Sequence, residues 1–388
     1  MLKKIILLGL VTAMCASLFA ACFNPEDDTP GITDIPRATP AAAAEAEEEE
    51  EPGEIITEPR FPQYISRALF EDIVEPDFRG NMHVVVGRNG FLFENGYINE
   101  FLGSAPKYVN VTDAELIERV ERLFDIQEAL KDRGIAFVVV ITPNKAASHS
   151  EFIPQFYIDE WPPLVDNYVR PYYRFLQFLK DHGVYHVDSS SLYRRIGMTN
   201  IFPRTGIHWN LMAAFETVDA IVTEFERQRG FEVRRLIAKG IIESPTPFGV
   251  EQDIFGLLYN TREGRQHIDN AWVDDRYYMP DVVLEPAGDK PRIGRTIIQG
   301  GSFKGELNRF FGGHGLASST YLIWYNNNNN LDGLNWDRIL RDTDLVLLEV
   351  NEQFVYNMGG TVPSWGQGDI DILPLGPNLI DHLWEFLR

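Results

Sequence analysis

A serine in a glycine turn is the clearest candidate for chemistry in this sequence. Ser302 follows Gly300 and Gly301, which come one residue after the strand-like segment 296–298, and a helix-like pattern at 304–311 begins two residues after the serine. A serine at such a strand-to-helix turn lies over a helix N-terminus, where its own N–H and the helix dipole favour a developing negative charge. This placement predicts a nucleophile, and a plain helix N-cap is the alternative interpretation.

A nucleophilic serine needs a base within hydrogen-bond reach, and His208 is the best candidate among the eight histidines. It stands in the loop 204–210, beside Trp209 and close to Gly206, just before a helix pattern at 211–225. The alternative is a histidine packed at a helix start. Because the serine and the histidine are far apart in the sequence, the hypothesis requires a fold that brings both to the same edge of one sheet.

Strand-like and helix-like segments alternate from Phe61 onward. The clearest helix is 112–132, where Thr112 and Glu115 form a capping box, and the clearest strand is the continuous apolar run 136–141. Further strands are expected at 82–86, 184–187, 296–298, 321–324 and 345–348, and further helices at 171–180, 211–225, 304–311, 336–340 and 379–387. The repeated order predicts an α/β fold with a parallel sheet, whose ligands bind at the carboxyl ends of the strands.

Together, the histidine and serine motifs resemble the SGNH-hydrolase-like domain of the AlgX/AlgJ alginate O-acetylation protein family. In that family a His-Trp pair lies upstream of a Gly-Asp-Ser-Phe turn. Further stretches agree in type and order, at 86–93, 134–145, 151–154 and 345–352. The resemblance covers about 80–386 and implies an SGNH-like three-layer α/β/α domain with a mainly parallel central sheet and a circularly permuted motif order.

The resemblance implies that Ser302 and His208 are catalytic and that the Gly301–Ser302 turn holds the oxyanion. Two family aspartates are missing, however. Gly206 stands two residues before the histidine, where the family has the carboxylate that orients the imidazole, and Gly301 stands directly before the serine. In other triads the loss of the orienting carboxylate lowers turnover by about 10⁴-fold. The two missing aspartates therefore weaken the prediction of catalytic activity, and the resemblance to the family remains.

Other residues are candidates for the rest of the site. Asp188, at the end of a strand-like run, is the first candidate for the missing acid, and Asp342 and Glu349 are weaker ones. Asn144 and Lys145 follow a strand end and are candidates for a second oxyanion donor or a supporting role, although they also fit a polar loop.

Composition excludes several kinds of partner. The formal net charge of −22 makes nucleic acid a poor ligand, because its phosphates would be repelled, and favours a neutral or weakly charged substrate. The sequence contains no His-Glu-x-x-His motif, cysteine cluster or Gly-x-x-x-x-Gly-Lys phosphate loop, so no metal and no cofactor is expected.

The N-terminus resembles a bacterial lipoprotein signal. Lys3 and Lys4 precede an apolar run at 5–20, which is shorter than the roughly 20 residues that span a bilayer. Small residues then lead to Cys22, the expected lipidation site, and an ordinary secretory signal cut near Ala21 is the alternative. Residues 1–22 are thus expected to be a signal peptide, 23–60 an acidic, Pro/Ala/Glu-rich disordered tether, and 61–388 the folded domain.

These features predict an extracytoplasmic O-acyltransferase, lipid-anchored to the bacterial membrane, that acetylates a cell-surface or exported polysaccharide. Ser302 would be the nucleophile and His208 the base, and the resemblance implies a membrane-bound acyltransferase as the partner that supplies acyl groups. Two alternatives remain open: a carbohydrate esterase or deacetylase with the same site, and a non-catalytic polysaccharide-binding lipoprotein with a degenerate triad.

Overall fold

The computed structural model describes residues 54–56, 75–81, 83–244, 249–258, 278–324, 335–355, 362–363, 369–370, 383–384 and 386–387. The chain divides into Met1–Pro52 and Gly53–Arg388. The expected signal peptide 1–22, with Cys22, and most of the expected tether lie outside the described residues. Among the described helices, none is both long and apolar enough to cross a membrane.

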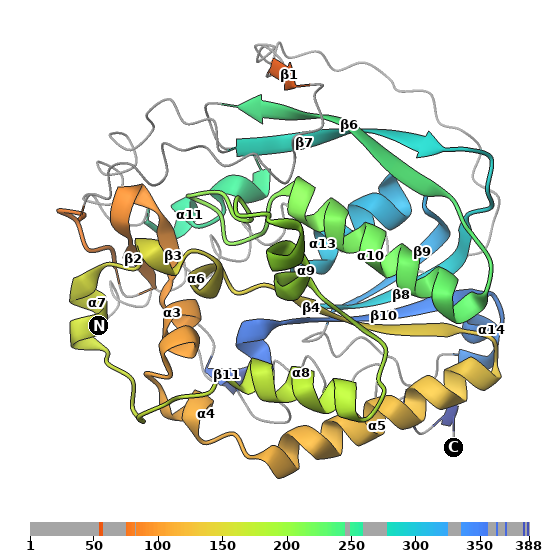
Figure 1. The fold of residues 1–388 in the computed structure, drawn as a ribbon, viewed down its shortest axis with the longest axis horizontal. Helices are drawn as coiled ribbons and strands as arrows, with labels where there is room; N and C mark the ends of the chain where they lie inside the picture. The colour runs from red at the N-terminus through yellow and green to blue at the C-terminus, as the bar shows by residue number, and fades with distance from the viewer. Residues whose placement is uncertain are drawn as a thin grey trace, which may run out of the picture. The chain divides into compact units, whose positions relative to one another are not determined.

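A five-stranded parallel sheet forms the centre of the fold (Figure 1). Its strands, in spatial order, are β5 (His186–Asp188), β4 (Ala136–Thr142), β10 (Thr343–Asn351), β8 (Ile293–Gly300) and β9 (Ala317–Trp324). Each neighbouring pair is parallel. All seven residues of β4 are buried, as expected for a strand covered on both faces. The predicted α/β fold class is confirmed.

Helices cover both faces of this sheet (Figure 1). One face packs against α5 (Asp113–Asp132), α8 (Pro171–Asp181) and α14 (Trp336–Arg341). The other packs against α9 (Ser189–Ile196), α10 (Leu211–Arg229) and α13 (Lys304–Asn308). Successive side chains of a strand point to opposite faces, so the odd-numbered residues 137–141 of β4 join the first group and the even-numbered residues 136–140 join the second. The result is the predicted three-layer arrangement.

Local sequence fixes where the principal helices begin. The Thr112 hydroxyl accepts from the Glu115 N–H at 3.3 Å, and the Glu115 carboxylate accepts from the Thr112 N–H at 2.8 Å, so the predicted capping box is confirmed at the start of α5. Asn210 caps α10 by accepting from the Ala213 N–H at 2.8 Å. This cap sets the start of α10 directly after the His208–Trp209 pair.

Shorter elements complete the description. The strands are the hairpin β2 (Val84–Val86) and β3 (Leu92–Glu94), and the pair β11 (Val362–Pro363) and β12 (Asp369–Ile370). The α-helices are α3 (Asn95–Leu102), α4 (Pro106–Val109), α6 (Lys145–Ser148), α7 (Gln155–Glu160) and α11 (Phe255–Leu258). The 3₁₀ turns are η3 (Arg88–Gly90), η4 (Ser150–Phe152), η5 (Gly249–Gln252) and η7 (Glu352–Phe354). The predicted helix 304–311 continues beyond α13 as a π-helical turn, η6 (Arg309–Gly313). The expected helix 379–387 is described at 383–384 and 386–387, where it is helical.

An antiparallel sheet was not predicted. Its strands are β1 (Glu54–Ile56), β6 (Arg235–Ser244) and β7 (Tyr278–Ala287), in that order. Leu236, Ile241 and Val282 bury their side chains in the same core cluster as α10. Strand β1 lies within the segment 23–60 that was expected to be disordered. The acidic run ends at Glu51, and the β-branched residues that follow suit a strand. The predicted domain boundary at 61 stays a prediction.

Candidate active site

Three neighbouring strands end at the rim that carries the candidate site. Strand β8 leads into Ser302, β10 ends just after Glu349, and β4 leads into Asn144 and Lys145. Since all three strands are parallel, their carboxyl ends meet at the same edge of the sheet, as expected for an open α/β site.

Ser302 lies in the turn between β8 and α13 and is partly exposed. The backbone N–H of Gly305 donates to the Ser302 carbonyl at 3.0 Å, which holds the serine in the first helical turn. The N–H of Ser302 itself donates no hydrogen bond to another residue in the described part of the chain. Hydroxyl and amide are therefore both placed at the rim of the sheet.

His208 lies in the loop that precedes α10, and its side chain is only 11% exposed. Its Nδ1 lies 2.5 Å from a carboxylate oxygen of Asp253. The second carboxylate oxygen of Asp253 accepts from the Ile207 N–H at 2.7 Å. The buried Nε2 has no hydrogen-bond partner within the described ranges. Because the carboxylate fixes the proton on Nδ1, neutral His208 presents Nε2 as a proton acceptor.

Ring contacts bring the histidine and serine loops together. Phe303, the residue after Ser302, has its ring centroid 5.0 Å from that of His208 and 5.7 Å from that of Trp209. The indole N–H of Trp209 also donates to Glu306, on α13, at 3.3 Å. These contacts place the two segments next to each other. The predicted meeting of the Ser302 hydroxyl with the His208 imidazole, and the catalytic roles of both, stay predictions.

Asp253 occupies the position of the acid that the sequence lacks at Gly206. A Cβ atom on Gly206 would lie 2.4 Å from the Val250 carbonyl oxygen and 2.8 Å from Glu251 Cα. The segment η5 to α11 therefore packs directly on Gly206, and the Thr205 hydroxyl anchors it by donating to the Glu251 carbonyl at 2.5 Å. Asp253 was not predicted from the sequence, because it follows directly after no expected strand and belongs to no recognised motif.

Asp188, the first candidate for this acid, is engaged elsewhere. Its carboxylate oxygens accept from the Tyr172 hydroxyl at 2.8 and 2.9 Å, at the end of the edge strand β5. Asp342 precedes β10 and so lies at the opposite edge of the sheet from the site. The carboxylate that contacts Nδ1 of His208 is that of Asp253, and not that of Asp188 or Asp342.

The Asn144 side chain makes structural hydrogen bonds. Its amide nitrogen donates to the Tyr97 carbonyl at 3.1 Å and to Glu100 at 2.7 Å, and its amide oxygen caps α6. With both N–H groups in use, Asn144 has no donor left for a reacting group. The backbone N–H of Gly301 is also occupied, because it donates to Glu349 at 2.6 Å. The contacts of both residues leave these donors no part in an oxyanion hole and fit the supporting role that was the alternative for them.

Lys145 holds the histidine loop. Its fully buried ammonium group donates to the carbonyls of Pro203 and Arg204, both at 2.8 Å, and of Gly206 at 2.6 Å. Burial lowers the pKa of Lys145, and Asp253 opposes that shift. Three acceptors at hydrogen-bond distance use all three protons of the charged form. These contacts fit the supporting role that was one of the two alternatives for Lys145, since they hold the loop that leads to His208.

Replacing Lys145 with methionine should destabilise the protein and impair the site together. The change leaves three buried carbonyls without a donor, each worth about 1–3 kcal/mol, so we expect a loss of about 3 kcal/mol or more in the free energy of unfolding. Urea denaturation measures this loss. The matched control is Lys180→Met, which removes an exposed lysine on α8. Equal stability of the two variants would contradict a structural role for Lys145.

The charges around His208 favour its protonated form. Burial lowers the pKa of His208, but the nearby carboxylates of Glu306, Asp253 and Glu349 outweigh burial and raise the pKa to about 9. Burial, and then the charge of Asp253, raise the pKa of Glu94 to about 8, so Glu94 is largely neutral at pH 7. The resting imidazole is mostly protonated at pH 7, and the neutral form that accepts a proton increases as the pH rises toward 9.

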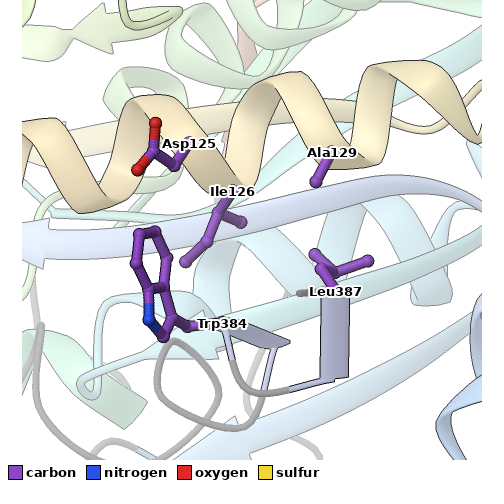
Figure 2. A pocket seen from close by; sticks show the side chains of 5 residues that line it. All are labelled: Asp125, Ile126, Ala129, Trp384 and Leu387. Atoms are coloured by element: carbon purple, nitrogen blue, oxygen red, sulfur yellow. The ribbon is translucent and has the colours of Figure 1, made fainter.

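A small pocket lies away from this site. It has a volume of about 170 Å³ and is lined by Asp125, Ile126, Ala129, Trp384 and Leu387, between α5 and the described C-terminal residues (Figure 2). None of these side chains belongs to the Ser302–His208 site. Within the described ranges, no group of three or more His, Cys, Asp or Glu side chains is arranged to hold a metal ion.

Comparison with known families identifies part of the chain. Residues 84–240 match the family model described as "SGNH hydrolase-like domain, acetyltransferase AlgX". The matched AlgX-type segment includes His208 and Lys145 and ends before Asp253 and Ser302. The predicted recognition of this family is confirmed.

Solved structures with similar folds include two O-acetylation proteins of Pseudomonas. The O-acetyltransferase domain of Pseudomonas putida AlgJ is 17% identical, with a TM-score of 0.48, over 78% of this chain and 99% of that chain. Pseudomonas aeruginosa AlgX is 14% identical, with a TM-score of 0.41, over 72% of this chain and 69% of that chain. Bacillus cereus PatB1 is 13% identical, with a TM-score of 0.36, over 63% of this chain and 91% of that chain. A comparison with curated protein sequences found no match.

Proposed function

We propose that the protein is an O-acyltransferase, acting with acetyl groups on a polysaccharide outside the cytoplasm. The observation that carries the proposal is the pairing of His208 with Asp253, which leaves Nε2 of His208 without a partner in the described part of the chain, beside the loop of Ser302. A carboxylate–imidazole pair next to a serine is the arrangement that activates a hydroxyl for acyl transfer. The AlgX-type sequence of residues 84–240 adds a family context of acetyl transfer.

The proposed reaction has two steps. In the first, Ser302 Oγ attacks the carbonyl carbon of the acyl donor while Nε2 of His208 takes the hydroxyl proton, and the collapse of the tetrahedral intermediate returns that proton to the leaving group. In the second, His208 takes the proton of a sugar hydroxyl, which attacks the acyl-serine, and then reprotonates Ser302 as the acylated sugar leaves. Asp253 stabilises the imidazolium in both steps.

The oxyanion requires a donor other than Gly301. The N–H of Ser302 is the proposed donor, because it makes no hydrogen bond to another described residue, whereas the Gly301 N–H is taken by Glu349. The two missing family aspartates were the main support for a non-catalytic protein. The contact of Asp253 with His208 supplies the orienting carboxylate from another part of the chain and so weakens that alternative.

Location and partners follow from the N-terminal sequence and the family. We propose that lipid on Cys22 anchors the protein to the bacterial membrane from the extracytoplasmic side, and that the acidic segment 23–60 spaces the domain from the surface. A membrane-bound acyltransferase is the proposed source of acyl groups. A neutral or weakly charged glycan is the proposed acceptor, because the acidic protein would repel a polyanion.

Acyl-enzyme trapping tests the function. The full-length protein in detergent is incubated with p-nitrophenyl acetate, with and without glycan oligosaccharides, and the products are followed by peptide and glycan mass spectrometry. Acetylation of the peptide that contains Ser302, followed by acetyl transfer to glycan, would support the proposal. Release of acetate alone, unchanged by glycan, would favour the esterase alternative. Absence of both the acyl-enzyme and turnover would favour a non-catalytic protein.

A further inference from the structure

Glu349 links three neighbouring strands directly behind the serine turn. It lies near the end of β10 with only 1% of its surface exposed. One carboxylate oxygen accepts from the Thr142 hydroxyl of β4 at 2.7 Å, and the other accepts from the Gly301 N–H, just after β8, at 2.6 Å. The Gly300–Gly301 peptide group, one peptide before that of Ser302, is therefore tied to β10 and β4 by a single buried side chain.

The contact between Glu349 and the turn depends on glycine. A Cβ atom on Gly300 would lie 2.4 Å from the carboxylate oxygen Oε2 of Glu349 and 2.6 Å from its Cβ. Any larger residue at position 300 would push the carboxylate away from the Gly301 N–H. Gly300 is therefore required for this close approach, in addition to any freedom that it gives the turn.

A second charged side chain lies near the next peptide group, which joins Gly301 to Ser302. Lys304 is fully buried, with its ammonium nitrogen 3.5 Å from the Gly301 carbonyl oxygen and 3.1 Å from the ring centroid of Trp324. Burial lowers the pKa of Lys304 to about 7, against the opposing effects of Glu349 and Glu306. The N–H of Gly301 thus faces a carboxylate, and its carbonyl faces an amine.

We propose that Glu349 is a positioning residue for Ser302. By holding the Gly301 N–H, it keeps the serine hydroxyl and N–H in a fixed position relative to His208. This inference rests on the proposed function. Glu349 acts through the backbone, because both of its oxygens are occupied by Thr142 and Gly301. Thr142 is itself held by the Asn351 amide, which donates to its hydroxyl at 3.3 Å and to the Pro143 carbonyl at 2.9 Å.

Graded variants separate positioning from general stability. Glu349→Leu removes both hydrogen bonds, and the rate of Ser302 acylation should fall about 10²-fold with little change in KM, because a small misplacement of a reacting group has an effect of this size. Glu349→Gln keeps an acceptor for the Gly301 N–H and should stay within about tenfold of wild type, since a charge-assisted bond is replaced by a neutral one. Thr142→Val removes one of the two hydrogen bonds to Glu349, so its acylation rate should lie between those of Glu349→Gln and Glu349→Leu. Thr296→Val is the matched control, because the buried Thr296 hydroxyl has no partner within the described ranges.

Hydrogen–deuterium exchange gives a readout that does not depend on activity. In full-length protein, Glu349→Leu should speed exchange of the peptide around Gly301 while α5 and β4 keep their protection. Wild-type acylation rates in Glu349→Leu, or unchanged exchange at Gly301, would overturn the positioning role. If Glu349→Leu lost protection throughout the protein, Glu349→Gln and Thr142→Val would provide the test instead. Acylation rates in these two variants equal to that of Thr296→Val would also overturn the positioning role. Wild-type protein that never acylates would instead refute the proposed function, while the exchange result would still test the contact.

Discussion

Ser302→Ala should lower acyl transfer by about 10⁶-fold and abolish the acyl-enzyme, because the oxygen that forms the covalent bond is gone while His208 and Asp253 remain without a nucleophile to activate. The fold should persist, since the Ser302 side chain is partly exposed and its turn is held by backbone and Glu349 contacts. Single-turnover release of p-nitrophenol measures the rate, and circular dichroism measures the fold.

Ser319→Ala provides the matched control for this variant. Ser319 is an exposed serine on β9, so the change removes the same atom from a neighbouring strand and should leave turnover unchanged. Undiminished acetyl transfer by Ser302→Ala would remove the serine from the reaction. Activity would then have to come from another group, and the proposed mechanism would be wrong.

Much of the fold could be predicted from local sequence. Helix α5 was predicted because Thr112 and Glu115 fix its start, and β4 because a continuous apolar run suits a strand buried on both faces. The antiparallel sheet was missed for a physical reason. Strand β6 mixes apolar with charged residues and is irregular near Gly240, so no clean alternation marks it, and its pairing with β1 and β7 is set by long-range contacts.

The candidate site divides in the same way. Ser302 and His208 stand in short motifs next to predicted elements, so the sequence was sufficient to propose them as a pair, and their catalytic roles stay predictions. Asp253 could not be predicted from the sequence, because it contacts His208 only when the segment η5 to α11 packs on Gly206. Glycine at 206 was interpreted as a lost carboxylate. In the folded protein, the absence of a side chain at Gly206 lets the segment that carries Asp253 pack beside His208.

Asp253→Asn should reduce acylation by about 10⁴-fold without unfolding the protein. The aspartate holds the proton on Nδ1 of His208, whereas an asparagine amide can donate to Nδ1 and so favour the tautomer that carries its proton on Nε2. An Nε2 that already carries a proton cannot accept one from Ser302. Asp281→Asn is the control, because it removes a carboxylate from an ion pair with Arg309 that is well exposed.

The pH dependence of the same variants tests the electrostatic part of the mechanism. In wild type, neutral His208 is the active base and its pKa lies at about 9, so the acylation rate should rise from pH 7 toward pH 9. Asparagine at 253 removes one of the carboxylates that raise this pKa, so the rise of the remaining activity should shift to lower pH. A stopped-flow pH profile of acylation measures both effects. If Asp253→Asn kept the wild-type rate and profile, the acid beside His208 would have no part in the chemistry, and the site would have to work as a serine–histidine pair alone.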